Sequence, residues 1–96
     1  MIELLLEAEG ALTMGLLDRA EHLYRQAAGA DPRSAAAVVG LARVALERGD
    51  DRRALQLAWR ALAIDPSDDI AARLAARLEE VLTTRGEALP SREVDA

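Results

Sequence analysis

The chain repeats itself at an interval of 34 residues, and this interval limits the folds open to it more than any other feature. Residues 1–34 align with residues 35–68 at ten identical positions. These are small, apolar or turn residues, plus one arginine: Ala8/Ala42, Ala11/Ala45, Leu12/Leu46, Gly15/Gly49, Arg19/Arg53, Ala20/Ala54, Leu23/Leu57, Ala27/Ala61, Asp31/Asp65 and Pro32/Pro66. An interval of this length is typical of arrays of helical hairpins, in which each hairpin buries its apolar face on the next one.

The match continues only briefly beyond Asp68. No third Gly-Asp turn falls on the register, because Thr83-Thr84 occupies its place. The composition favours helices, since 51% of the residues are hydrophobic but only 2% are aromatic, and alanine and leucine supply most of the apolar positions. The sequence therefore predicts an all-α fold, a short solenoid of two hairpins and one lone capping helix, about five helices in total.

Turn residues set the bounds of these helices. Gly15 and Gly49 interrupt the apolar periodicity, Asp31-Pro32 and Asp65-Pro66 end it, and Ser34 is a predicted N-cap. The predicted helices cover residues 2–14, 17–29, 35–48, 51–63 and 69–84. We expect one domain over residues 1–85, with repeats at 1–34 and 35–68 and a capping helix at 69–84, and a disordered tail over residues 86–96.

With these residues in place, the chain resembles the tetratricopeptide repeat family. The residues that carry the resemblance are Leu4, Ala8, Ala20, Tyr24, Ala27 and Pro32 in the first copy, and Val38, Leu41, Ala42, Ala54, Ala61 and Pro66 in the second. Glu7, Ala11, Ala45 and Ala58 depart from the family pattern. Small residues have a physical reason here, because Ala8 opposite Ala20, and Ala42 opposite Ala54, would allow paired helices to approach closely.

The resemblance implies that the first helix of each hairpin lines a concave groove. The residues on that face are Ile2, Leu5, Glu9 and Leu12, then Ala36, Val39, Arg43 and Leu46, then Ile70, Arg73, Arg77 and Glu80. One interpretation is a groove that grips a peptide or protein segment, with apolar contacts at one end and an acidic group near Arg43, Arg73 and Arg77. The alternative is that these arginines pair locally, Arg43 with Glu47 and Arg73 with Asp69.

Two further features allow a second function. The first helix is apolar on more than one face, and its large apolar side chains are Ile2, Leu4, Leu5, Leu6, Leu12 and Met14. It therefore either docks on another protein or a second copy of this chain, as in a structural subunit, or packs inward. Trp59 is either an anchor on the outer face or a cover for the last helix.

Charge and residue content argue against several other classes. The net charge of −5 disfavours nucleic acid as a partner, and the chain has no cysteine. We expect no membrane insertion, because no apolar run is long enough, and a cytoplasmic location. His22 is the only histidine, and Ser34 and Ser67 are explained by capping, so we expect no metal, no cofactor and no enzymatic activity. The favoured function is a non-catalytic interaction module or adaptor.

Overall fold

The computed structural model describes residues 2–92, and five α-helices fill most of that range. They are α1 (Ile2–Thr13), α2 (Leu17–Ala30), α3 (Ala35–Glu47), α4 (Asp51–Ile64) and α5 (Asp69–Thr84). Every bound lies within one residue of its predicted place, and no strand occurs among the described residues. The predicted all-α fold of helical hairpins is confirmed.

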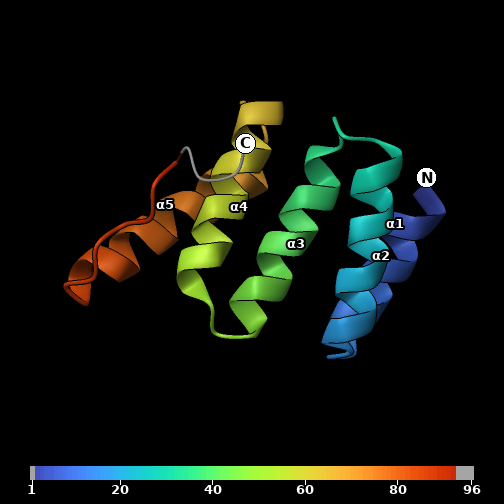
Figure 1. The fold of residues 1–96 in the computed structure, drawn as a ribbon, viewed down its shortest axis with the longest axis horizontal. Helices are drawn as coiled ribbons and strands as arrows, with labels where there is room; N and C mark the ends of the chain where they lie inside the picture. The colour runs from blue at the N-terminus through green and yellow to red at the C-terminus, as the bar shows by residue number, and fades with distance from the viewer. Residues whose placement is uncertain (1, 93–96) are drawn as a thin grey trace.

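The helices stand in chain order, with α1 and α2 at one end and α5 at the other (Figure 1). Each helix packs against its neighbours in the sequence, and α1 also contacts α3. The molecule measures 39 × 26 × 22 Å along its principal axes. Because α1, α3 and α5 are the first helices of successive units, side chains from all three can meet on one side of the array.

Glycine ends three of the helices in the left-handed conformation. Gly15, Gly49 and Gly86 have φ angles of 77°, 82° and 76°. After each glycine the next backbone N–H donates to a carbonyl five residues back, with N–O distances of 2.9 Å in all three cases. This pattern satisfies the last carbonyls of a helix. The third turn thus exists, but it lies three residues beyond the register position, and α5 is correspondingly longer than α3.

Side-chain caps begin three of the helices. Ser34 accepts a hydrogen bond from the Ala37 backbone N–H at 3.2 Å, which confirms the predicted cap of α3. Asp50 and Asp68 cap α4 and α5 in the same way, at 3.2 and 3.0 Å. At the start of α2 the cap position is Leu16, and no side-chain hydrogen bond forms there. The backbone at Leu16 therefore has nearly the conformation found at Asp50, but the leucine side chain has no group that can accept the hydrogen bond.

Two apolar clusters form the core. The larger joins α3, α4 and α5, and the smaller joins α1 and α2 with Val44 from α3. Leu41 packs against both clusters and links them. Ala8, Ala20, Ala42 and Ala54 are completely buried, as expected for residues where paired helices approach closely. No polar or charged residue among residues 2–92 is buried.

Tyr24 packs closely on Gly40 between the two hairpins. The Tyr24 ring is buried and lies against α3 at Gly40, where an added Cβ would stand only 2.2–2.4 Å from three ring carbons. Real Cβ atoms do not approach a ring so closely, so the ring occupies the space that any other residue at position 40 would need. Glycine is required there for packing, although its φ angle is not in the left-handed region.

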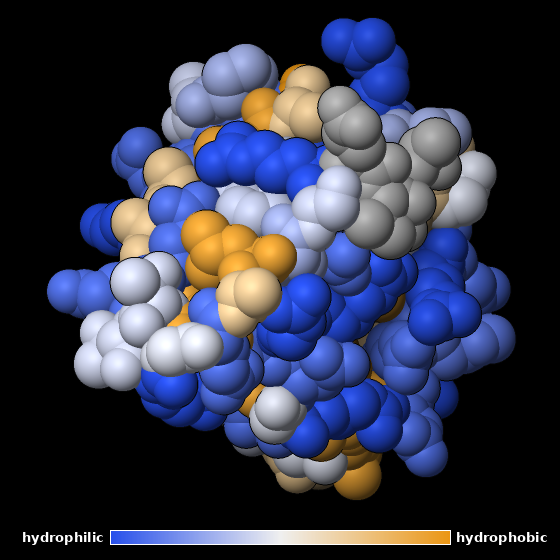
Figure 2. All heavy atoms as spheres, turned by 60° about the vertical axis from the view of Figure 1, so that its left-hand side comes forward, coloured by the Kyte–Doolittle hydropathy of each residue, from blue (hydrophilic) through white to orange (hydrophobic). Residues whose placement is uncertain are grey.

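Beyond α5 the chain runs without helix or strand through residues 87–91 and lies against α4 and α5. Pro90 is buried, Arg52 donates a hydrogen bond to the carbonyl of Ala88, and Arg92 pairs with Glu79 at 3.3 Å. The predicted disordered tail stays a prediction, and residues 93–96 lie outside the described range. The face toward α5 is mostly hydrophilic, with apolar side chains in small separate patches (Figure 2).

Candidate functional site

A small cavity of about 150 Å³ lies where α1, α3 and the start of α5 come together. Its lining is Leu5, Glu9, Tyr24, Ala36, Val39, Gly40, Arg43, Asp68 and Ile70. We call this surface the first-helix groove. Six residues of the predicted groove face line it, namely Leu5, Glu9, Ala36, Val39, Arg43 and Ile70. Tyr24, Gly40 and Asp68 line it as well and were not among the predicted site residues.

The apolar part of the first-helix groove comes from three different helices. Leu5 on α1 is half-buried, Val39 on α3 is 5% exposed, and Ile70 on α5 is 55% exposed. These positions lie in different repeats of the sequence, and the 34-residue register brings them to one side of the array. Ile70 is the large apolar side chain of the groove with the most exposed surface.

The polar part is an ion pair between the first two units. Arg43 Nη1 donates to both carboxylate oxygens of Glu9, at 3.1 and 3.2 Å, and the Tyr24 hydroxyl donates to the same carboxylate at 3.2 Å. Burial, reinforced by the negative charge of Glu9, raises the pKa of Tyr24 to about 12. The predicted local pair of Arg43 with Glu47 does not form among residues 2–92, because Arg43 reaches across to α1 instead.

Arg73 and Arg77 complete the predicted arginine set. They follow Ile70 on α5 at i+3 and i+7, so they lie on the same side of that helix. Both are exposed, and neither forms an ion pair with any residue in the described range 2–92, Asp69 included. Arg43 is therefore already neutralised by Glu9, whereas Arg73 and Arg77 keep their charges beside the exposed Ile70.

Other predicted site residues lie elsewhere. Leu12 is 8% exposed and belongs to the smaller core cluster, and Leu46 packs against the larger one, since both point between helices. Ile2 is 62% exposed and does not line the first-helix groove. Within α1 the side chains divide, because Leu4 and Leu5 pack inward while Ile2 and Leu6 remain outside.

Trp59 is not an exposed anchor. It is 7% exposed within the larger cluster, its Nε1 donates to Glu79 on α5 at 2.8 Å, and the Arg92 guanidinium lies 4.3 Å from its ring centroid. Trp59 therefore packs as a cover for α5, the last helix, and not as an anchor on the outer face. The Arg92 contact adds a cation–π interaction over the ring.

The arrangement of helical hairpins agrees with the result of comparison with known protein families. A family model described as tetratricopeptide repeat matches residues 11–78, which extend from within α1 to within α5. The chain belongs to the tetratricopeptide repeat family. Comparison with curated proteins and with solved structures finds no significant match.

Tetratricopeptide repeats generally mediate protein–protein interactions, and as a family they are non-catalytic interaction modules. Within residues 2–92, no group of three or more histidine, aspartate or glutamate side chains is placed to hold a metal ion. None of the helices in the same range is both long and apolar enough to cross a membrane.

Proposed function

We propose that this chain is a protein-interaction module whose first-helix groove binds a peptide or protein segment that carries an acidic group and an apolar side chain. The acidic group pairs with Arg73 and Arg77. The apolar side chain contacts Ile70 and the neighbouring Leu5 and Val39.

One observation carries the proposal. Arg73 and Arg77 are the predicted arginines that have no ion-pair partner among residues 2–92, and they stand on the same side of α5 as the exposed Ile70. Charge-assisted hydrogen bonds to a carboxylate are stronger than neutral ones, and an adjacent apolar contact adds the burial that a charge pair lacks. Arg43 contributes to the shape of the groove but not its charge, because Glu9 already occupies it.

Selection of a random linear peptide library on the intact chain tests the proposal. We expect selected peptides to contain Asp or Glu together with a large apolar residue. Arg73→Ala combined with Arg77→Ala should weaken their binding at least about tenfold, the size expected when one charge-assisted contact is lost. Ile70→Asp should weaken the same peptides, since it places a negative charge at the apolar contact.

The matched control replaces two exposed arginines that do not line the first-helix groove, Arg19→Ala with Arg33→Ala. All variants exchange exposed side chains, so circular dichroism should show the wild-type helix content. If the selected peptides bind the Arg73/Arg77 variant as tightly as the wild type, the first-helix groove is not their binding site.

A second candidate function is a structural subunit that associates through the outer face of α1. The observation that favours it is the exposure of Ile2, Leu6 and Met14, which are 62%, 66% and 74% exposed at one end of the array. Exposed apolar side chains that lie together on a surface mark an interaction site. Sedimentation velocity of the purified chain over a range of concentrations tests self-association, and Leu6→Gln should abolish it. A monomer at every concentration would eliminate the homodimer.

A further inference from the structure

A second cleft lies on the other side of α3 from the first-helix groove. It has a volume of about 440 Å³ and runs between α2 and α4, with α3 as its floor. Leu41, Val44 and Arg48 face this cleft, whereas Val39 and Arg43 face the first-helix groove, because the two sets lie on opposite sides of α3. We call it the α2–α4 cleft. It uses none of the residues that line the first-helix groove.

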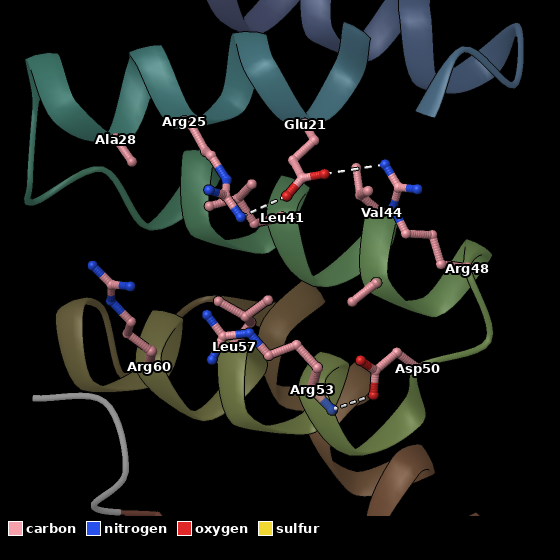
Figure 3. A pocket seen from close by; sticks show the side chains of 11 residues that line it. Glu21, Arg25, Ala28, Leu41, Val44, Arg48, Asp50, Arg53, Leu57 and Arg60 are labelled. Atoms are coloured by element: carbon pink, nitrogen blue, oxygen red, sulfur yellow. Dashed lines mark hydrogen bonds and ion pairs between the residues drawn. The ribbon is translucent and has the colours of Figure 1, made fainter. Parts of the chain in front are cut away.

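Four arginines converge on the α2–α4 cleft from three helices. Arg25 stands on α2, Arg48 directly follows α3, and Arg53 and Arg60 stand on α4, as Figure 3 shows. The lining has two acidic residues, Glu21 and Asp50, and Asp18 beside it also pairs with Arg48 at 2.7 Å, so a small positive excess remains. The whole chain has a net charge of −5, so this local excess opposes the overall balance.

Both acidic residues of the cleft already have partners within the protein. Glu21 uses both carboxylate oxygens, one on Arg25 at 2.6 Å and one on Arg48 at 3.0 Å. Asp50 accepts the backbone N–H of Arg53 as the cap of α4. Arg60 forms no ion pair with any residue of the described range, and in Figure 3 it rises from α4 toward the α2 wall. Arg60 therefore offers a cationic group that the protein itself leaves for a ligand.

The interior of the cleft is apolar. Leu41, Val44 and Leu57 line it below the arginines, and Ala28 and Ala45 add small apolar surface. Leu41 is half-buried, so part of its side chain remains accessible in the cleft. A ligand that carries only negative charge would leave this surface in contact with water. A ligand with both a carboxylate and a large apolar side chain would satisfy the rim and the floor together.

We propose that the α2–α4 cleft is a second binding site, for an acidic peptide segment that inserts a large apolar side chain between α2 and α4. Its carboxylate pairs with Arg60 on the α4 wall, and Arg25 on the α2 wall, which shares Glu21 with Arg48, adds positive charge opposite it. A nucleic acid fits the cleft less well, because its phosphates would meet Glu21 and Asp50 and the overall negative charge, and its backbone would not use the apolar floor. This site is independent of the proposed function of the first-helix groove.

The same random peptide library tests the cleft. Each selected peptide is measured against the wild-type chain and against each pair of arginine substitutions. We expect a class rich in Asp and Glu with Leu, Ile, Met or Phe, whose binding falls at least about tenfold with Arg25→Ala plus Arg60→Ala. Arg73→Ala with Arg77→Ala should leave that class unchanged. The methyl resonances of Leu41 and Leu57 should shift when such a peptide is added, which a long-range charge effect alone would not produce.

The outcomes separate this proposal from the proposed function. If every selected peptide depends only on Arg73 and Arg77, the α2–α4 cleft is not a binding site and the first-helix groove is. If every selected peptide depends only on Arg25 and Arg60, the cleft is the binding site and the groove is not. A library that yields no peptide dependent on Arg25 and Arg60 overturns the proposal. A single-stranded RNA oligonucleotide that displaces the selected peptides and binds more tightly would overturn it in favour of nucleic acid.

Discussion

The contact of Tyr24 with Gly40 is where a single residue type is most strictly required. A methyl group at position 40 would meet the Tyr24 ring at 2.2–2.4 Å, whereas a methyl group at Gly10 in α1 would meet no atom within 4 Å. Both glycines lie inside helices, where alanine is favoured by about 1 kcal/mol. They therefore form a natural pair in which helix propensity is the same and packing differs.

We predict opposite effects of alanine at these two positions. Gly10→Ala should raise the free energy of unfolding by about 0.5–1 kcal/mol. Gly40→Ala should lower it by about 1–2 kcal/mol, because overpacking costs about 1–3 kcal/mol and helix propensity offsets only part of that. Urea denaturation of both variants measures the difference. Equal stabilisation by the two substitutions would show that the Tyr24 ring moves aside freely.

Among the elements, α2 has a defect that the repeat itself shows how to repair. Leu16 and Asp50 occupy equivalent positions before α2 and α4, with φ and ψ of −86° and 74° at Leu16 and −94° and 76° at Asp50. Only Asp50 provides a capping carboxylate, and Leu16 leaves 47% of its apolar surface exposed. The backbone at the start of α2 is thus already arranged for a cap that its side chain cannot make.

Leu16→Asp should stabilise the chain by about 0.5–1 kcal/mol, because the new carboxylate can accept the backbone N–H three residues on, as Asp50 does. The reverse substitution, Asp50→Leu, should cost about 1 kcal/mol. Thermal unfolding followed by circular dichroism compares the two variants with the wild type. Destabilisation by Leu16→Asp would mean that Leu16 contributes more through packing than the cap returns.

The elements were largely predictable from the sequence, whereas the contacts between them were less so. Glycine, proline and capping residues are local signals, and they placed every helix bound within one residue. The Glu9–Arg43 pair joins residues 34 positions apart, so a search for i, i+4 partners predicted Glu47 instead. Glu9 and Arg43 carry opposite charges at equivalent positions of neighbouring repeats, and this was the feature of the sequence that could have predicted their pairing.

The binding surfaces were hard to predict for the same reason, because they depend on contacts between helices. The α2–α4 cleft combines residues from three helices whose relative rotation depends on packing, which no local pattern encodes. Trp59 likewise had two interpretations until the position of Glu79 on α5 was known. Repeat register predicts which residues share a face, but it does not predict which of them are already paired.

At the scale of the whole molecule, packing is unevenly distributed along the array. The larger cluster holds the buried side chains of α4 and α5 and most of those of α3, including Leu55 and Leu82, which are completely buried. The smaller cluster contains seven buried residues among those described, against fifteen in the larger one, and one of the seven, Val44, comes from α3. In an array of repeats, each unit is stabilised mainly by the units beside it.

This distribution predicts a gradient of stability. We expect native-state hydrogen exchange to be slowest in α3 and α4, which are packed on both sides, and fastest in α1, where Ile2 and Leu6 stay exposed. Exchange measured over rising urea should show α1 opening at a lower free energy than global unfolding. The same free energy for all five helices would instead mean that Leu41 and the Tyr24–Gly40 contact couple the two clusters into one cooperative unit.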